Sequence, residues 1–207
     1  MDSRNLLILT VYLIIVTYVF YQAYKSLGGQ VVVELDSADL NQQLREKALD
    51  DIVAVKFKFR DSYRLGELTK LPIVLKNKSQ EHSISVDWNV SSIIDFDNVT
   101  GRVIRLTPGL TAIPQNQAVS ILAPDQSIDE ELTDDKDIAA PLFKPAKLKK
   151  AIDSGTPFYL RLFLTISNIV STDVDKRSQI LSCRLVPKKL SWTRALVIAM
   201  KPKPPKK

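Results

Sequence analysis

Hydrophobic and polar positions divide the chain into an apolar N-terminal run and a longer region in which the two alternate. Twenty uncharged residues separate Arg4 from Lys25, and residues 6–20 are almost wholly apolar. An α-helix rises about 1.5 Å per residue, so a helix of this length spans roughly 30 Å, the thickness of the hydrocarbon core of a bilayer. We therefore predict a transmembrane helix over residues 6–24, preceded by a short flank of residues 1–5.

The position of each residue along this helix predicts its place in the bilayer. Tyrosine favours the lipid–water interface, and Tyr18, Tyr21 and Tyr24 cluster toward the C-terminal end of the run, with Lys25 directly after them. These four residues are therefore the expected interface contacts. The residues expected to span the membrane are Leu6, Leu7, Ile8, Leu9, Val11, Leu13, Ile14, Ile15, Val16, Val19 and Phe20.

We expect this segment to remain as an anchor rather than to be removed as a signal peptide. Its apolar region is longer than a signal peptide needs, and the leading MDSRN is only weakly charged. Two alternatives stay open. One is a signal peptide cleaved at Ser26-Leu27-Gly28, which is a passable site, and the other is a buried core helix.

The side of the membrane that holds the domain is only weakly indicated. Flanking charge is nearly equal at the two ends of the span, so the positive-inside rule barely discriminates. An uncleaved N-terminal anchor usually translocates the chain on its C-terminal side, so we expect a single-pass protein with its domain on the non-cytoplasmic side. Three sequons, at Asn77, Asn89 and Asn98, favour the same side if the source is eukaryotic.

Residues 25–51 are predicted to form a juxtamembrane linker that contains one amphipathic helix. Asp36 offers an N-cap, and Leu40, Leu44 and Ala48 recur at every fourth position of an otherwise polar segment. This spacing predicts a helix of about three turns that packs on the edge of the domain. A helix lying on the membrane surface is the alternative.

From residue 52 the pattern changes to the twofold alternation of half-buried strands. Every second residue from Phe158 to Ile166 is apolar and is predicted to face the core, as are Ile84, Val86 and Trp88. Residues 71–75 and 83–90 are expected to form a hairpin-like or sheet-crossing pair. The expected strands are 30–35, 52–59, 71–75, 83–90, 93–96, 102–107, 118–122, 158–166, 179–186 and 194–200.

Many short strands with turn signals between them predict a mainly β domain over residues 52–200, built as an antiparallel β-sandwich. Trp88, on an early strand after a polar turn, resembles the third strand of an immunoglobulin-like domain over about 25 residues. This resemblance of architecture implies an immunoglobulin-like sandwich, although the paired cysteines of antibody domains are absent. A small β-barrel is the alternative.

A long charged insertion, residues 123–156, interrupts the strands and exceeds an ordinary sandwich loop. Its first half holds seven carboxylates between Asp125 and Asp137 and is expected to be mobile. Calcium binding is the alternative there, but the ligand spacing of a calcium loop is missing. Residues 144–152 are predicted to form a short basic helix, and residues 201–207 form a basic Pro/Lys tail.

The sequence offers no set of residues for catalysis, for a cofactor or for a metal ion. One histidine, His82, and one cysteine, Cys183, are too few for a zinc site, which takes about four ligands. No Gly-rich phosphate-binding motif or nucleophile elbow occurs. Asp95 and Asp97 flank Phe96 as a carboxylate pair that we expect to face solvent beside a turn. We therefore predict a protein that is not an enzyme and needs no cofactor.

The net charge of +6 is concentrated toward the C-terminus. Basic residues near a membrane are attracted to anionic lipid. The candidate lipid or partner contacts are Lys201, Lys203, Lys206 and Lys207. The aromatic residues on which nucleic-acid bases would stack are missing from this region except for Trp192, so no nucleic-acid partner is expected, and no small-molecule substrate is indicated.

These observations predict a non-catalytic interaction, scaffold or assembly module that is integral to a membrane. Its expected partner is another membrane or envelope protein. Two alternatives stay open. One is a membrane-bound enzyme with a carboxylate-based site around Asp87, Asp95 or Arg161. The other is an electrostatic adaptor that binds anionic lipid through its basic C-terminus.

Overall fold

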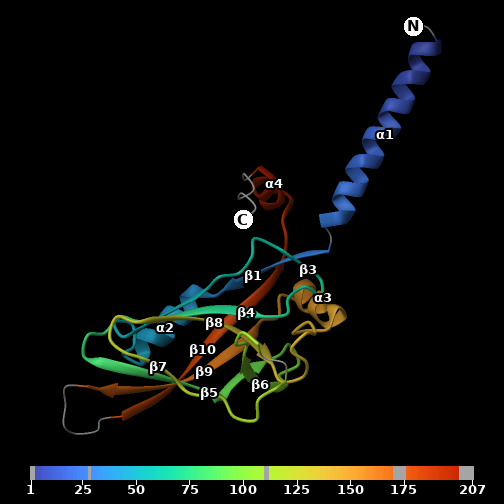
Figure 1. Ribbon diagram of the computed structural model, residues 1–207. Coiled ribbons are helices and arrows are strands. Elements are labelled where there is room, and N and C mark those ends of the chain that lie inside the picture. The colour runs from blue at the N-terminus through green and yellow to red at the C-terminus, as the bar shows by residue number, and fades with distance from the viewer. Residues whose placement is uncertain (1–2, 28, 110–111, 170–175, 201–207) are drawn as a thin grey trace.

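The computed structural model describes residues 3–27, 29–109, 112–169 and 176–200. Figure 1 shows an antiparallel sheet curled into a half-barrel, with helix α1 (Ser3–Leu27) standing away from it. Strands hold 42% of the residues and helices 25%, so the prediction of a mainly β, antiparallel domain behind one apolar helix is confirmed. The immunoglobulin-like sandwich is not confirmed, because the strands follow one another in one continuous sheet.

The sheet contains ten strands, whose order differs from their order in the sequence. The strands are β1 (Gln30–Leu35), β2 (Val53–Phe57), β3 (Tyr63–Arg64), β4 (Leu71–Asn77), β5 (His82–Ile94), β6 (Thr100–Arg105), β7 (Ser120–Leu122), β8 (Ser127–Asp134), β9 (Phe158–Asn168) and β10 (Lys176–Lys189). Their order in the sheet is β2-β4-β8-β6-β5-β9-β10-β1-β3, with β7 beside β5. The other helices are α2 (Ser37–Glu46), α3 (Pro145–Ser154) and α4 (Trp192–Met200).

Two irregularities bend this sheet. Strand β6 pairs with β5 through residues 100–102 and with β8 through residues 103–105, so it stands at the corner between two halves. Strand β5 shifts its register against β9 between Asp87 and Ser92, as a β-bulge does, and a bulge increases local twist. Strand β5 joins the strand expected at residues 83–90 to the first two residues of the strand expected at 93–96. It forms no hairpin with β4, because β8 and β6 lie between them.

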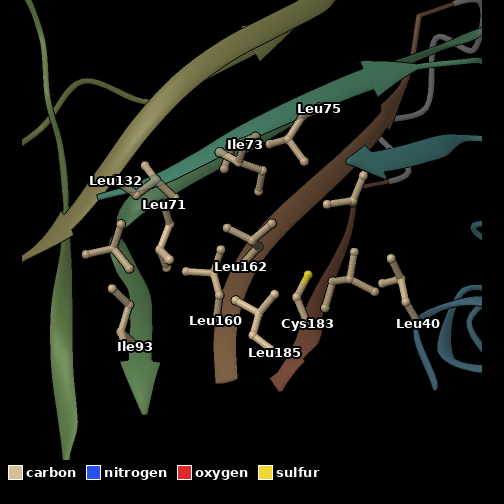
Figure 2. Close-up of a cluster of buried hydrophobic side chains, with 14 of the residues drawn as sticks. Leu40, Leu71, Ile73, Leu75, Ile93, Leu132, Leu160, Leu162, Cys183 and Leu185 are labelled. Atoms are coloured by element: carbon tan, nitrogen blue, oxygen red, sulfur yellow. The ribbon is translucent and has the colours of Figure 1, made fainter. Parts of the chain in front are cut away.

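The core fills the concave side of the half-barrel with branched aliphatic side chains. Phe158, Leu160 and Leu162 of β9 are each 0% exposed, as their alternation predicted. Figure 2 shows leucine and isoleucine side chains from β4, β8 and β9 meeting Cys183 of β10 and Leu40 of α2. Trp88 is also fully buried, and its Nε1 donates a hydrogen bond to Ser120 Oγ at 2.9 Å.

Residues 127–134 form strand β8 in the middle of the sheet, so the expectation of a mobile acidic insertion is wrong for this stretch. Its carboxylates meet cations from neighbouring segments: Asp129 pairs with Lys58, Glu130 with Arg105 at 3.2 Å, and Glu131 with Lys70 at 2.5 Å. Opposite charges on adjacent strands stabilise a sheet modestly. A run of carboxylates can therefore occupy a central strand.

Of the two helices nearer the C-terminus, one was predicted as a helix and the other as a strand. Helix α3 confirms the short basic helix expected at residues 144–152. Helix α4 replaces the strand expected at residues 194–200, because periodicity alone cannot distinguish a strand from a helix in a short apolar run. The backbone N–H of Arg194 donates to Ser191 Oγ at 3.3 Å, a contact typical of a helix N-cap.

The β domain was predicted to begin at residue 52, but strand β1 and helix α2, which come earlier in the chain, also belong to its sheet and core. Strand β1 pairs with β10 from Val31, opposite Lys189, to Leu35, opposite Leu185. Helix α2 is confirmed, and the side chain of its N-cap Asp36 accepts a hydrogen bond from the backbone of the first turn. Its Leu40 and Leu44 are buried in the main core, so α2 packs on the domain.

Helix α2 also covers β10 beyond the point where β1 ends. Gln43 Nε2 donates to the Ser182 carbonyl at 2.9 Å, and Gln43 Oε1 accepts from the Ser182 N–H at 3.1 Å. Lys47 Nζ donates to the carbonyl of Ile180. The side-chain amide thus occupies the place of a neighbouring strand's peptide group, which closes this part of the sheet edge.

Candidate functional site

Helix α1 exposes apolar side chains on every face. Its predicted membrane-spanning residues are 45% to 65% exposed, apart from the half-buried Val16. Within the part of the chain that the structure describes, residues 4–22 form the one helix long and apolar enough to cross a membrane. A helix that is apolar all round needs apolar surroundings. Length and composition fit a membrane span, although a signal sequence can share both.

The predicted interface contacts are only partly visible. Tyr18 and Tyr21 are each 61% exposed on α1. Tyr24 and Lys25 belong to α1, but their side chains lie outside the described residues. The candidate lipid contacts Lys201, Lys203, Lys206 and Lys207 also lie outside them. Their contacts therefore remain predictions.

A groove of about 670 Å³ lies at the open side of the half-barrel, with β1 and β2 on its walls. Strand β2 is at one end of the sheet, and among the described strands it pairs only with β4. Strand β3 pairs with β1 only at Gln30 and Val31. Among the described residues, the outer edges of β2 and of β1 beyond Val31 therefore have no strand partner. Unpaired strand edges are templates for an added strand.

The walls of this groove combine aromatic surface with charges of both signs, three cations and the two carboxylates Glu34 and Asp61. The rings of Phe57 and Phe59 stack with their centroids 5.3 Å apart. Lys56 and Arg60 also line the groove, and neither forms an ion pair with any residue that the structure describes. Arg194 of α4 lies at the same groove and pairs with a carboxylate of β1. The groove can therefore hold apolar side chains next to carboxylates.

Asp95, one of the two carboxylates predicted as a pair, lines a second cavity, of about 530 Å³, together with Lys147 of α3. The expectation that both face solvent is wrong for Asp95, whose side chain is 11% exposed. Lys147 of α3 lies 3.5 Å from Asp95 and also bonds Asp97. Its hydrogen bond lowers the pKa of Asp97, and the same bond raises the pKa of Lys147. Asp97 and Lys147 therefore stay charged at neutral pH and fasten α3 to the β5–β6 turn.

The lone histidine and the lone cysteine lie apart from these features. His82 is the first residue of β5, and its Nδ1 is 3.0 Å from Ser79 Oγ in the turn before that strand. Cys183 is buried on β10, and its burial, helped by the charge of Asp39, raises the pKa of its thiol to about 12. Across the described ranges, no three His, Cys, Asp or Glu side chains form a group suited to a metal ion.

The three sequons differ in accessibility. Asn77 is 0% exposed, and its Nδ2 donates to the His82 carbonyl at 2.7 Å. Asn89 is half-buried and donates to the Gln117 carbonyl at 2.8 Å. Asn98 is exposed in the β5–β6 turn. A glycan could therefore be attached to the folded domain at Asn98 but not at Asn77.

The chain matches no protein-family model, no curated protein and no solved structure. Its class is therefore the broad one that the fold defines: a mainly β domain with open sheet edges behind an apolar helix. Local sequence reasoning missed the groove, because its residues come from 32–61 and from Arg194. No signal within either segment marks them as neighbours, since the strand order brings them together.

Proposed function

We propose that this chain is a single-pass membrane protein whose β domain is a non-catalytic interaction, scaffold or assembly module for another membrane or envelope protein. The observation that carries this proposal is the groove between β1 and β2, where two strand edges are open. The neighbouring edge of β10 is closed by Gln43. An open edge beside a closed one fits a site at which an extended partner segment adds a strand.

The groove also indicates the chemistry of that segment. Alternate side chains of an added strand point to the same side. The ring pair of Phe57 and Phe59 fits apolar side chains, and Lys56 and Arg60, which have no ion-pair partner among the described residues, fit acidic ones. We therefore expect an extended segment in which apolar and acidic residues alternate. Strand β1 comes shortly after α1 in the chain, so the groove would be within reach of proteins in the same membrane.

The anchor is tested by the mass and extraction behaviour of the protein made in cells. We expect the mass of the full 207-residue chain, in a membrane fraction that resists alkaline carbonate and dissolves in detergent. A mature protein that begins at Gly29 would show that the segment is a cleaved signal peptide. That result would remove the membrane anchor from the proposal.

The groove is tested by a photocrosslinking residue placed at Asn41, which lines it, in the full chain in native membranes. The matched control places the same residue at Lys76, which is exposed on β4, a strand with partners on both sides. We expect an adduct from position 41 that mass spectrometry maps to an extended acidic and apolar segment of a membrane or envelope protein. The double variant Lys56→Glu, Arg60→Glu should weaken it.

Three results would count against a partner strand in the groove. The first is an equal adduct yield from positions 41 and 76. The second is an adduct that the double charge reversal does not change. The third is an adduct with a second copy of this chain, which would make the groove a self-association site.

A further inference from the structure

Helices α1 and α4 leave the domain at the same place. The first residues of β1 pair with the last residues of β10, with Val31 opposite Lys189. The backbone N–H of Leu190 then donates to the carbonyl of Gln30 at 3.1 Å. Helix α1 ends just before β1, and α4 begins just after β10. Figure 1 shows both helices on the same side of the sheet.

Helix α4 is too short and too apolar to stand alone in water. It has nine residues, and seven of them are apolar in the sequence WTRALVIAM. Isolated helices shorter than about 12 residues are marginal in water. Figure 1 shows α4 separate from the curled sheet, and its Val197 is 58% exposed. The helix therefore needs an apolar surface that the sheet does not supply to Val197.

The charges around α4 are mainly positive. Glu34 pairs with Lys188 at 2.8 Å and with Arg194, so one carboxylate meets two cations. Lys189 beside them is exposed. The sequence after α4 adds more lysines and no acidic residue. A helix with apolar residues and basic neighbours suits the boundary between acyl chains and anionic headgroups.

We propose that α4 lies in the interface of the bilayer that α1 crosses, with Val197 toward the acyl chains and with Arg194 and the neighbouring Lys188 and Lys189 of β10 near anionic phospholipid headgroups. This inference rests on the proposed membrane anchoring. Since Arg194 also lines the groove, a second membrane contact at α4 holds the groove next to the membrane surface. Two membrane contacts, one at α1 and one at α4, then fix the tilt of the domain relative to the bilayer.

The test uses the full chain in vesicles that contain about 30 mol% phosphatidylglycerol, a level at which basic interfacial helices are attracted. Because Cys183 is buried, a fluorescent thiol label can be directed to one introduced cysteine. The variants are Val197→Cys on α4, Ile121→Cys as an exposed control on β7, and Ile14→Cys within α1. Lipids with a nitroxide on the acyl chain quench labels that reach the bilayer.

We expect quenching at position 197 to exceed that at position 121 by about threefold or more and to weaken when the anionic lipid is omitted, because interfacial binding depends on both acyl contact and charge. The inference would be overturned, and the anchor left intact, if the label at position 14 were strongly quenched but the label at 197 were quenched no more than the label at 121. Weak quenching at 14 would overturn the anchor, and the inference with it. Equal quenching at 197 with and without anionic lipid would overturn the role of the cations.

Discussion

Replacing Gln43 by alanine should reopen the edge of β10 that α2 closes. The substitution removes two hydrogen bonds to Ser182, of 2.9 and 3.1 Å, and a third to Asp39 at 2.7 Å. A hydrogen bond contributes roughly 0.5–1.5 kcal/mol net, so the two bonds to Ser182 are worth about 1–3 kcal/mol. Water can replace part of this at a half-buried site. We expect the free energy of unfolding to fall by about 2 kcal/mol.

The assay is urea unfolding of the full chain in detergent micelles, followed by far-UV circular dichroism. The matched control is Gln42→Ala, because Gln42 is exposed on the same helix and its side chain bonds only Glu46 among the described residues. It should change the free energy of unfolding by less than about 0.5 kcal/mol. Gln43→Glu keeps an acceptor for the Ser182 N–H but sets a carboxylate against a carbonyl oxygen, so it should lose as much as alanine. Equal stability of Gln43→Ala and Gln42→Ala would refute the reasoning.

Four further outcomes are expected from the core and the charged groups. Leu162→Ala empties a site that is 0% exposed and should cost about 2–5 kcal/mol in the same urea titration, whereas a cost below about 1 kcal/mol would contradict a packed core. Trp88→Phe removes the indole bond to Ser120 and should cost about 1 kcal/mol, because Ser120 keeps a second donor. Since burial raises the pKa of Cys183 to about 12 from an ordinary 9.0, the thiol should resist disulfide reagents until the chain unfolds. The free energy of unfolding should also fall as the pH rises above 9.0, the ordinary pKa of the thiol, because the thiol of the unfolded chain ionises first. Hydrogen bonds from Lys188 and Arg194 lower the pKa of Glu34 from an ordinary 4.5. The ionised Glu34 therefore contributes to the free energy of unfolding above pH 4.5, and this contribution is lost as the pH falls through the lowered pKa. Glu34→Gln should remove that acid-side loss in a urea titration repeated across pH.

Residue alternation predicted the parts of the fold in which one strand face is buried. In β9 the apolar positions from Phe158 onward are the buried ones, because a strand sends alternate side chains to opposite faces. Strand β8 was missed for a physical reason. Its carboxylates resemble those of a solvated loop until Lys58, Lys70 and Arg105 are placed beside them. Those cations are distant in sequence, so only the strand order reveals the pairing.

The candidate sites depended even more on long-range arrangement. Helix α1 was evident from composition, because its residues 6–20 are almost wholly apolar. The groove was not evident from composition, since it exists only where β1 and β2 lie near each other without pairing. Helix α4 has an apolar sequence that suits a strand or a helix. Its significance comes from the pairing of Val31 with Lys189, which places it beside the end of α1.

The pairing of β1 with β10 has a consequence for biosynthesis. About 150 residues separate the two strands, and a ribosome adds roughly 5–20 residues per second, so β1 waits on the order of 8–30 s for its partner. During that interval α1 is already synthesised while the sheet that follows it in the chain is incomplete. A nascent chain stopped before residue 185 would lack the segment that pairs with β1. The domain is therefore expected to complete its fold late, and β1 stays exposed as an unpaired strand until β10 has been made.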